Sequence, residues 1–430
     1  MDVASLALVC GALLAFSLIS GRLEGTVLTP PMIFILFGFL IGESVLDIAR
    51  VDPGHGAIHL IAELTLILVL FSDAARIKLT QLRRDHDLPV RMLLIGLPLT
   101  MALGAWTALL LFPDLGFWEA VLLAALLAPT DAALGQSVVS AEEVPVRIRQ
   151  AINVESGLND GIALPAVLLF AALASAGQDS AQAADWIEFG LLQITIGPLA
   201  GVAAGYAGAR LLDSATHGGW AGPSFQGVGI LALAVLAYTV AELIGGNGFI
   251  AAFVSGIVFG AAVRHPCTFL FEFMEAEGQL LMLITFLVFG AALLPEGLAH
   301  FTAASFLYAV LSLTVVRMLP IAVSLIGSGL KLPSVLFLGW FGPRGLASIL
   351  FVLLILEQTD IVHETELLSI TVLTVALSAL AHGLTAAPLA RIYGRRAALM
   401  GESEENMPVS ELPLREGLGA RRLLPGRHIR

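Results

Sequence analysis

The chain has 430 residues, of which 57% are hydrophobic and only 13% charged, and its formal net charge is −12. Its mean hydropathy is +0.90. Soluble domains carry about 25% charged residues, so this composition excludes an ordinary soluble protein and predicts an all-α polytopic membrane protein in contact with lipid. No basic stripe favours nucleic acid as a partner, and two cysteines, Cys10 and Cys267, favour neither a disulfide framework nor a metal cluster.

Apolar runs of about 20 residues, the length of a membrane-spanning helix, recur along the whole chain. The first run follows Met1 and Asp2 without a basic region or a cleavage site, which predicts a retained helix rather than a signal peptide. We predict about thirteen spans, at roughly 3–20, 28–46, 57–76, 89–112, 117–139, 147–176, 187–212, 224–244, 247–263, 274–294, 301–327, 333–356 and 366–392.

Lysine and arginine gather in alternate connections, from Arg22 after the first span to Arg395 and Arg396 after the last. The intervening connections hold only Arg50. Positive residues mark the cytoplasmic side of a membrane protein, so the pattern predicts an outside N-terminus and a cytoplasmic C-terminus in the cell (inner) membrane.

Carboxylates inside the fifth and sixth spans are the main functional signal. Asp131 lies in LLAPTDAALG, and Asn159-Asp160 lies in NVESGLNDGIALP. A charged group at bilayer depth costs at least ~2.5–3.5 kcal/mol on insertion scales and indicates an ion or proton site. Counted at about 1.5 Å per helical residue, Asp131 and Asp160 both fall near the middle third of the bilayer.

The sixth span presents four oxygen-bearing side chains on one helix face and its adjoining turns. Glu155, Ser156, Asn159 and Asp160 follow the i, i+1, i+4 and i+5 spacing. Such a face suits a hard monovalent cation, although Asn159 is as consistent with helix packing as with ligation. In the fifth span Pro129 should release backbone carbonyls, which in transporters commonly complete a cation shell.

The twelfth span carries a matching interruption at FGPRGLAS, residues 341–348. Broken spans five and twelve are seven apart, which fits two inverted six-helix repeats, spans 1–6 and 8–13, whose broken helices cross at the site. Within the spans the basic residues are Arg317 and Arg344, and we predict Arg344 as the partner of Glu155. His382 is interpreted as a surface group.

The two motifs APTDAALGQSVV and NVESGLNDGIALP together resemble the monovalent cation/proton antiporters, in the sodium/proton exchanger branch with its prokaryotic NhaP-like members. The resemblance covers essentially the whole membrane region. It extends to ELTLILVLFSDAARI at 63–77, YTVAELIGGNGFIAAFVSGIVFG at 238–260, FGPRGLAS at 341–348 and ALAHGLTAAPLARIYGRR at 379–396.

The resemblance implies a homodimer in which a core part moves like an elevator against a dimerisation part. The transmembrane domain would span 1–394, followed by a short cytoplasmic tail at 395–430. Its parts would be a dimerisation part at about 1–80 and 224–294, a core part at about 89–176 and 301–394, and a linker helix at about 187–212.

The resemblance also implies the site residues. The cation and proton would bind at Thr130, Asp131, Glu155, Ser156, Asn159 and Asp160, with Na⁺ held by Asp131, Asp160, Ser156 and Thr130, while Arg344 pairs with Glu155. Electrogenic relatives have a second aspartate in place of Asn159, so an asparagine implies electroneutral exchange. No cofactor is implied beyond the transported ions, and no soluble catalytic partner.

Exchange of Na⁺, or of Li⁺ or K⁺, for H⁺ in pH homeostasis is therefore the leading hypothesis, with a K⁺/H⁺ antiporter as its close alternative. A sodium-coupled solute symporter should offer a polar cavity for its solute, and none is legible. An intramembrane aspartyl protease, the enzyme alternative, should show Gly-x-Gly-Asp, whereas residues 157–160 read GLND. We accordingly expect a transporter and not an enzyme.

Overall fold

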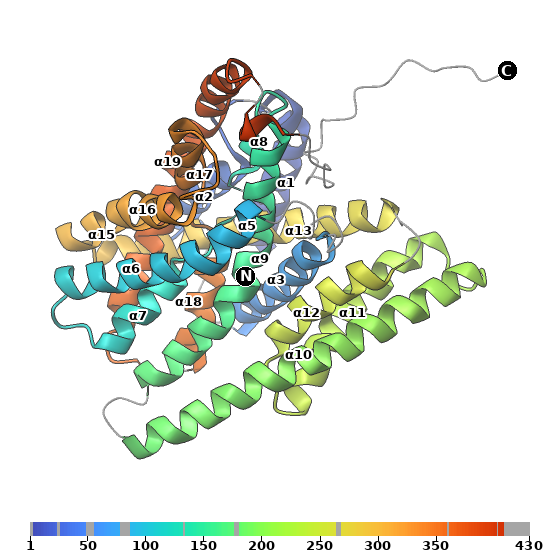
Figure 1. Ribbon diagram of the computed structural model, residues 1–430. Helices are drawn as coiled ribbons and strands as arrows, with labels where there is room; N and C mark the ends of the chain where they lie inside the picture. Colours follow the sequence, from blue (N-terminus) through green and yellow to red (C-terminus); the bar gives the residue numbers. More distant parts are fainter. Residues whose placement is uncertain are drawn as a thin grey trace.

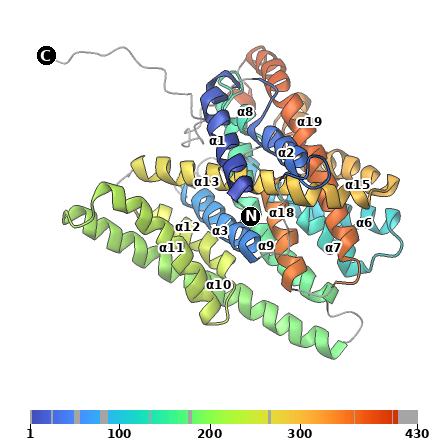
Figure 2. The same cartoon turned by 180° about the vertical axis from the view of Figure 1, so that it is seen from behind.

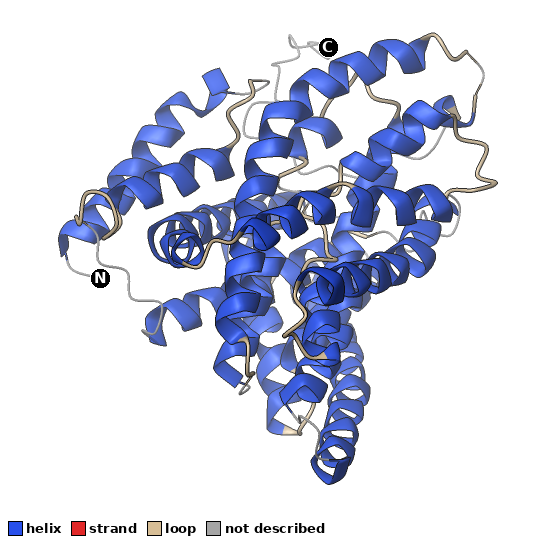
Figure 3. Ribbon diagram, turned by 90° about the vertical axis from the view of Figure 1, so that its left-hand side faces the viewer, coloured by secondary structure: helices blue, strands red, loops and turns tan. Residues whose placement is uncertain are grey.

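The computed structural model describes residues 3–23, 26–48, 56–77, 87–131, 134–175, 180–263, 268–358, 361–401 and 403–407. Within these ranges all regular structure is helical and no strand forms (Figure 3), as the composition predicts. The elements are α1 Val3–Leu23, α2 Pro30–Ile41, α3 Gly56–Ala75, α5 Asp87–Arg91, η1 Met92–Gly96, α6 Leu97–Leu111, α7 Phe117–Leu126, α8 Gln136–Val139, α9 Val146–Ser175, α10 Ser180–His217, α11 Pro223–Leu243, α12 Gly248–Ala262, α13 Thr268–Val288, η2 Phe289–Leu293, α14 Leu294–Ala299, α15 Ala303–Leu313, α16 Val315–Ser324, α17 Leu332–Trp340, α18 Leu346–Gln358, α19 Glu364–Ala398 and η3 Glu404–Asn406.

Each predicted apolar run falls on helical structure, although the boundaries differ. In the described part of the chain, six helices are long and apolar enough to cross a membrane, and shorter apolar helices accompany them. The seventh run is the least well bounded, because α10 begins and ends several residues outside the predicted 187–212. The last helix, α19, continues to Ala398, beyond the predicted end at 392.

The helices form two neighbourhoods with α9 between them. In Figure 1, α10, α11 and α12 lie together on one side, while α6, α7, α15 and α16 lie on the other. The view from behind in Figure 2 shows α13 across the middle of the molecule, with α2 packed beside it. The most extensive packing is that of α12 against α10 and α3, whereas α9 contacts α7 and α18 as well as α3 and α10.

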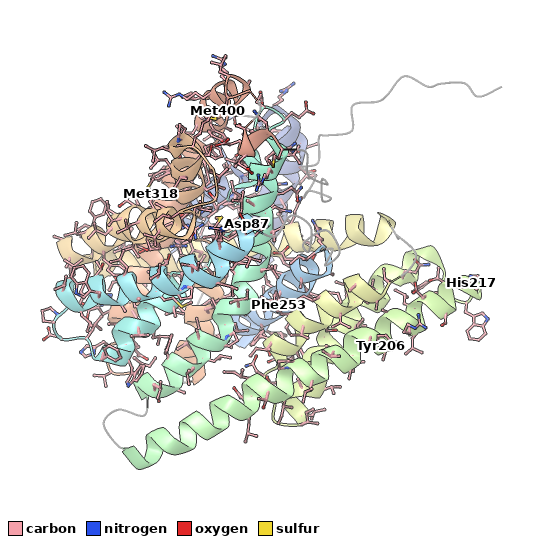
Figure 4. All side chains as sticks on the ribbon, in the orientation of Figure 1. Asp87, Tyr206, His217, Phe253, Met318 and Met400 are labelled. Carbon is pink, nitrogen blue, oxygen red and sulfur yellow. The ribbon has the colours of Figure 1, made fainter. Side chains whose placement is uncertain are left out.

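Glycines allow the close contact between α10 and α12. Gly197, Gly201 and Gly205 lie one helical turn apart on α10. A Cβ atom at any of them would collide with a backbone carbonyl oxygen, either of α12 itself or of the residue just before it. Small residues at such a seam let two helix backbones approach directly, which increases van der Waals contact inside a membrane. On the same helix, the side chains of Tyr206 and His217 point away from the neighbouring helices (Figure 4). The seam therefore brings the backbones of α10 and α12 into direct contact.

Two glutamates in this neighbourhood have partners of their own. The Tyr238 hydroxyl donates to the carboxylate of Glu63, which links α11 to α3. Glu242 accepts a hydrogen bond of 2.7 Å from the Gly248 N–H at the start of α12. A carboxylate at a helix N-terminus satisfies an orphan N–H and complements the helix dipole. Both contacts favour a structural role for Glu63 and Glu242 over a role in transport.

The described part of the C-terminal segment, residues 403–407, is docked on the helices. Glu405 is fully buried and accepts hydrogen bonds from the Lys331 N–H at 2.7 Å and the Ser334 hydroxyl at 2.8 Å. Arg147, at the start of α9, donates to the Glu404 carbonyl oxygen at 2.7 Å and also pairs with its carboxylate. Met400, labelled in Figure 4, marks where α19 gives way to this segment. Residues 408–430 lie outside the described residues.

We expect acidification to release this segment. Burial alone raises the pKa of Glu405, but hydrogen bonds from Lys331 and Ser334 help to outweigh burial and hold the pKa below its ordinary value. A carboxyl with a lowered pKa stabilises the docked state above its ordinary pKa, and that stabilisation is lost as the pH falls through the lowered value. A spin label at position 407, in a variant without the native cysteines, should gain mobility on acidification. Glu405→Gln should be mobile already at neutral pH.

The matched control is Glu142→Gln, because Glu142 is an exposed carboxylate in the connection just before α9. Its label at position 407 should stay as immobile as in the parent protein. An immobile label in Glu405→Gln at neutral pH would contradict the role assigned to this carboxylate.

Candidate cation-binding site

The fifth span is broken where its sequence contains proline. Helix α7 ends at Leu126, and residues 127–131, which include Pro129, are not helical. Proline cannot donate a backbone hydrogen bond and clashes with a preceding helical turn. The next two side chains, Thr130 and Asp131, are therefore carried on a non-helical segment inside the protein, and they are 1% and 9% exposed.

The twelfth span is broken at residues 341–345, between α17 and α18. Two glycines there are sterically required. A Cβ atom at Gly345 would overlap the carboxylate of Asp131, and one at Gly342 would overlap the guanidinium of Arg317. The glycines thus let two charged side chains reach the backbone of the break.

Direct hydrogen bonds hold the two breaks together. The Asp131 N–H donates to the Pro343 carbonyl oxygen at 2.8 Å, and the Leu346 N–H donates to the Asp131 carboxylate at 2.8 Å. Leu346 is the first residue of α18, so Asp131 accepts from a helix N-terminus, where the helix dipole favours a negative charge. The predicted meeting of the two broken spans is thus present in the structure.

The predicted face of α9 lies against the first break. The contacts between this face and the break centre on Thr130. The Thr130 hydroxyl is 3.1 Å from the Ser156 hydroxyl and 3.4 Å from Glu155 Oε2, and it accepts a hydrogen bond from the Asn159 side-chain amide. Asp160 follows Asn159 on the same helix and is 9% exposed. The structure therefore brings Thr130, Glu155, Ser156 and Asn159 into contact, with Asp160 next to Asn159 on α9.

Asn159 is oriented by the bond it donates. Because its amide nitrogen is turned towards Thr130, its oxygen points to another side, and Asn159 Oδ1 accepts no hydrogen bond from a described residue. A buried amide oxygen that the protein leaves unsatisfied is uncommon and calls for a reason, such as a bound ion. Its chemistry suits a hard monovalent cation.

The ion pair of Glu155 differs from the prediction. Arg317, on α16, donates from Nη1 to Glu155 Oε1 at 2.7 Å and from Nη2 to Oε2 at 2.8 Å. Both side chains are almost completely buried. This bidentate geometry uses both carboxylate oxygens, so the predicted pair between Glu155 and Arg344 is wrong. The cause lies in the fold, because α16 aligns the Arg317 fork with α9.

Arg344 has a different set of partners, although it is fully buried as well. Its Nη1 donates to the carbonyl oxygens of Ala128 at 2.7 Å and Pro129 at 3.1 Å. These are carbonyls that the broken fifth span releases, and the sequence predicts such carbonyls as part of a cation shell. A guanidinium satisfies them instead, so the cation ligands are to be sought among side-chain oxygens.

The buried charges of the site almost cancel. Asp131, Glu155 and Asp160 are three carboxylates, and Arg317 and Arg344 are two guanidinium groups. Fully ionised, this set carries one net negative charge. A buried charge is costly unless it is compensated, so the set is best satisfied by a single additional positive charge.

His382 lies in the interior, contrary to the prediction of a surface group. It is fully buried on α19, with its Nε2 atom 2.9 Å from the Trp340 carbonyl oxygen and its Nδ1 atom 3.1 Å from the Ser378 hydroxyl. Sequence reasoning misses this residue because a position near the end of a span suggests contact with solvent. A usable signal is present: Thr371, Thr374, Ser378, His382 and Thr385 recur at three- and four-residue spacing and form one polar face of α19.

Two interrupted helices that meet at buried carboxylates define a class, the secondary transporters that bind small ions at mid-membrane depth. The family described as "Sodium/hydrogen exchanger, transmembrane" matches residues 5–392. The chain belongs to this family of cation and proton transporters.

Individual relatives are similar over long stretches. The K(+)/H(+) antiporter NhaP of Alkalimonas amylolytica is 22% identical over 412 residues, covering 95% of this chain and 70% of that protein. The K(+)/H(+) antiporter NhaP2 of Shewanella baltica is 24% identical over 324 residues, where the match spans 74% of this chain and about half, 54%, of the relative. The Na(+)/H(+) antiporter 2 of Zygosaccharomyces rouxii is 30% identical over 193 residues, 42% of this chain and 23% of its own length.

The fold also has a solved counterpart. The sodium proton antiporter MjNhaP1 of Methanocaldococcus jannaschii, at pH 8, superposes with a TM-score of 0.78 at 19% identity, covering 93% of this chain and 99% of that one. At this identity the likeness establishes the fold.

Proposed function

We propose that the protein exchanges one monovalent cation for one proton across the membrane. The observation that carries this proposal is the buried set of three carboxylates and two guanidinium groups, which is one positive charge short of neutrality. Either a proton or a monovalent cation would supply that charge. Because both would neutralise the same set, their binding is mutually exclusive, and such competition is sufficient for coupled exchange.

Asp160 is the group we assign to both ions. A bound cation and a bound proton would each neutralise its carboxylate, so only one of them is held at a time. Side-chain oxygens around it can complete the shell, namely Asn159 Oδ1 and the hydroxyls of Ser156 and Thr130, with Asp131 on the facing break. Glu155 is held by Arg317 and serves as a fixed charge that positions Thr130.

Electroneutral exchange follows from the same charges. Asn159 has no carboxyl group and cannot carry a second proton. With Glu155 held by Arg317, and Asp131 bound at the N-terminus of α18, one titrating group remains in the proposed mechanism. The loaded site would then be neutral with either ion, which lowers the cost of moving it through the membrane.

Movement of a core part against a fixed scaffold is the transport step that we propose. The scaffold would contain spans 1–3 and 8–10, and the core spans 4–6 and 11–13, in two inverted repeats with thirteen spans in all. This division is supported by the close packing of α12 with α3 and by the hydrogen bonds that tie the two breaks to each other. We further propose a homodimer in the inner membrane, with the N-terminus outside and the C-terminus in the cytoplasm.

The cation is the open choice within this function. Of the three relatives described above, two are named for K⁺ and one for Na⁺. Na⁺ is our first assignment. The proposed ligands are a small number of side-chain oxygens, because the backbone carbonyls of the first break already accept hydrogen bonds from the Arg344 guanidinium. K⁺ exchange is the second candidate, favoured by the relative that matches 95% of the chain.

The test is exchange in proteoliposomes that contain a pH-sensitive dye. An outward gradient of Na⁺, Li⁺ or K⁺ should drive proton uptake, fastest for Na⁺, and liposomes without protein should show none. An imposed diffusion potential should leave the initial rate of exchange unchanged. The potential is set with K⁺ and valinomycin, or with a lipophilic anion if the protein transports K⁺. A rate or an end-point gradient that follows the potential would disprove one-for-one exchange and implicate Asp131 as a second proton site.

A further inference from the structure

A buried hydrogen-bond chain connects α19 to the break of the twelfth span. The Arg344 N–H donates to the Ser378 hydroxyl oxygen at 2.7 Å, Ser378 lies 3.1 Å from His382 Nδ1, and His382 Nε2 lies 2.9 Å from the Trp340 carbonyl oxygen. Trp340 is the last residue of α17, and Arg344 is two residues before α18. The chain of bonds thus joins both ends of the break to one helix.

The directions of these bonds place a hydrogen on one nitrogen of the imidazole. A carbonyl oxygen only accepts, so His382 Nε2 must carry a hydrogen to bond Trp340. The Ser378 oxygen accepts from the Arg344 N–H, and its own hydrogen is then directed to His382 Nδ1. His382 Nδ1 also lies 3.0 Å from the Ser378 carbonyl oxygen, so this nitrogen faces both the hydroxyl and the carbonyl of Ser378. The neutral ring with hydrogen on Nε2 donates to Trp340 and accepts from the Ser378 hydroxyl.

The surroundings of the ring oppose a second proton on it. The charged groups that act on His382 are the guanidinium groups of Arg344, from the break, and Arg317, from α16. Both are positive and buried. The ring of Trp340 covers His382 at a centroid distance of 4.9 Å, with Phe341 further away at 6.5 Å. The site therefore accommodates a neutral imidazole with fixed donor and acceptor atoms.

The break that this hydrogen-bond chain holds is the one that meets the cation site. Its Pro343 carbonyl oxygen accepts from the Asp131 N–H, the following Leu346 N–H donates to the Asp131 carboxylate, and the Arg344 guanidinium bonds the carbonyls of Ala128 and Pro129. A shift at residues 341–345 would move all of these partners together.

We infer that His382 and Ser378 are positioning residues for ion exchange: they fix residues 341–345 and thereby set the place of Asp131, while His382 stays neutral throughout the cycle. This inference rests on the proposed function. It excludes His382 as a carrier of the transported proton and as the group that sets the pH dependence of exchange.

The variants that test it separate hydrogen bonding from titration. Glutamine has an amide donor and an amide acceptor and does not titrate, so His382→Gln should keep the cation KM and the pH profile of the parent protein. His382→Leu and Ser378→Ala should raise the cation KM by about tenfold, the usual order for losing one buried hydrogen bond. The matched control is Ser369→Ala, because Ser369 is a buried serine of α19 whose hydroxyl bonds Gly297 at 2.9 Å, away from the break.

A second measurement does not depend on transport. Hydrogen exchange of the peptide that contains residues 341–346 should accelerate in His382→Leu and Ser378→Ala and stay at the parental rate in His382→Gln and Ser369→Ala. If the parent protein transports no cation, the proposed function fails while this measurement still decides the positioning role. A His382→Gln protein with a shifted pH profile would overturn the inference, and so would a His382→Leu protein with parental KM and parental hydrogen exchange.

Discussion

Asp160→Asn should abolish cation-driven proton flux while the protein remains folded. Asparagine keeps the shape and one oxygen of the aspartate, but it can neither take up a proton nor supply the negative charge that the cation neutralises. The remaining buried set, Asp131, Glu155, Arg317 and Arg344, would be neutral without any bound ion. The variant site should therefore be neutral without a bound ion, so that neither a cation nor a proton is needed to balance its charge.

The measurement is exchange in proteoliposomes together with the melting temperature of the detergent-purified protein. Asp114→Asn is the control, because Asp114 is an exposed aspartate in the connection before α7. It should exchange at the parental rate. Cation-dependent proton flux that survives in Asp160→Asn would disprove the assignment of Asp160 as the shared site.

Arg317→Met should lower the stability of the protein strongly. Both members of the Arg317–Glu155 pair are almost completely buried, and the guanidinium occupies both carboxylate oxygens. Removing the arginine leaves a buried carboxylate without its partner, which usually costs about 3–5 kcal/mol of unfolding free energy. Methionine fills much of the volume, so the loss reports the charge rather than a cavity.

A double-mutant cycle isolates the pair. Glu155→Gln in the Arg317→Met background should recover part of the lost stability, because the uncompensated charge is then gone. Arg396→Met, a change at an exposed arginine in the last turn of α19, should alter the melting temperature little. Strictly additive losses for Arg317→Met and Glu155→Gln would show that the pair contributes nothing as a unit.

The sequence predicts those features of the fold that depend on local chemistry. Hydropathy places the helices, because each span must satisfy its own backbone within lipid. Pro129, and Pro343 with its flanking Gly342 and Gly345, predict the two breaks, since their effects on the backbone are local. The spacing of Glu155, Ser156, Asn159 and Asp160 predicts a shared face for the same reason.

Features that depend on how helices rotate against one another cannot be predicted in this way. Two arginines, Arg317 and Arg344, lie in spans that could reach the glutamate of α9. Their sequence positions do not show which one lines up with Glu155, because the answer depends on the orientation of α16. The burial of His382 cannot be predicted for a related reason. A residue near the end of a span can still lie on the face of the helix that is turned inwards.

The docked turn at 403–407 has a practical meaning for how motion in this molecule can be observed. Its contacts run to Arg147 on α9, to Lys331 and Ser334 at the start of α17, and to the end of α19, all within the proposed core. A probe fixed to this turn would travel with the proposed core, whereas one on α12 would stay with the proposed scaffold. The distance between two such probes would therefore report the proposed movement of the core against the scaffold directly.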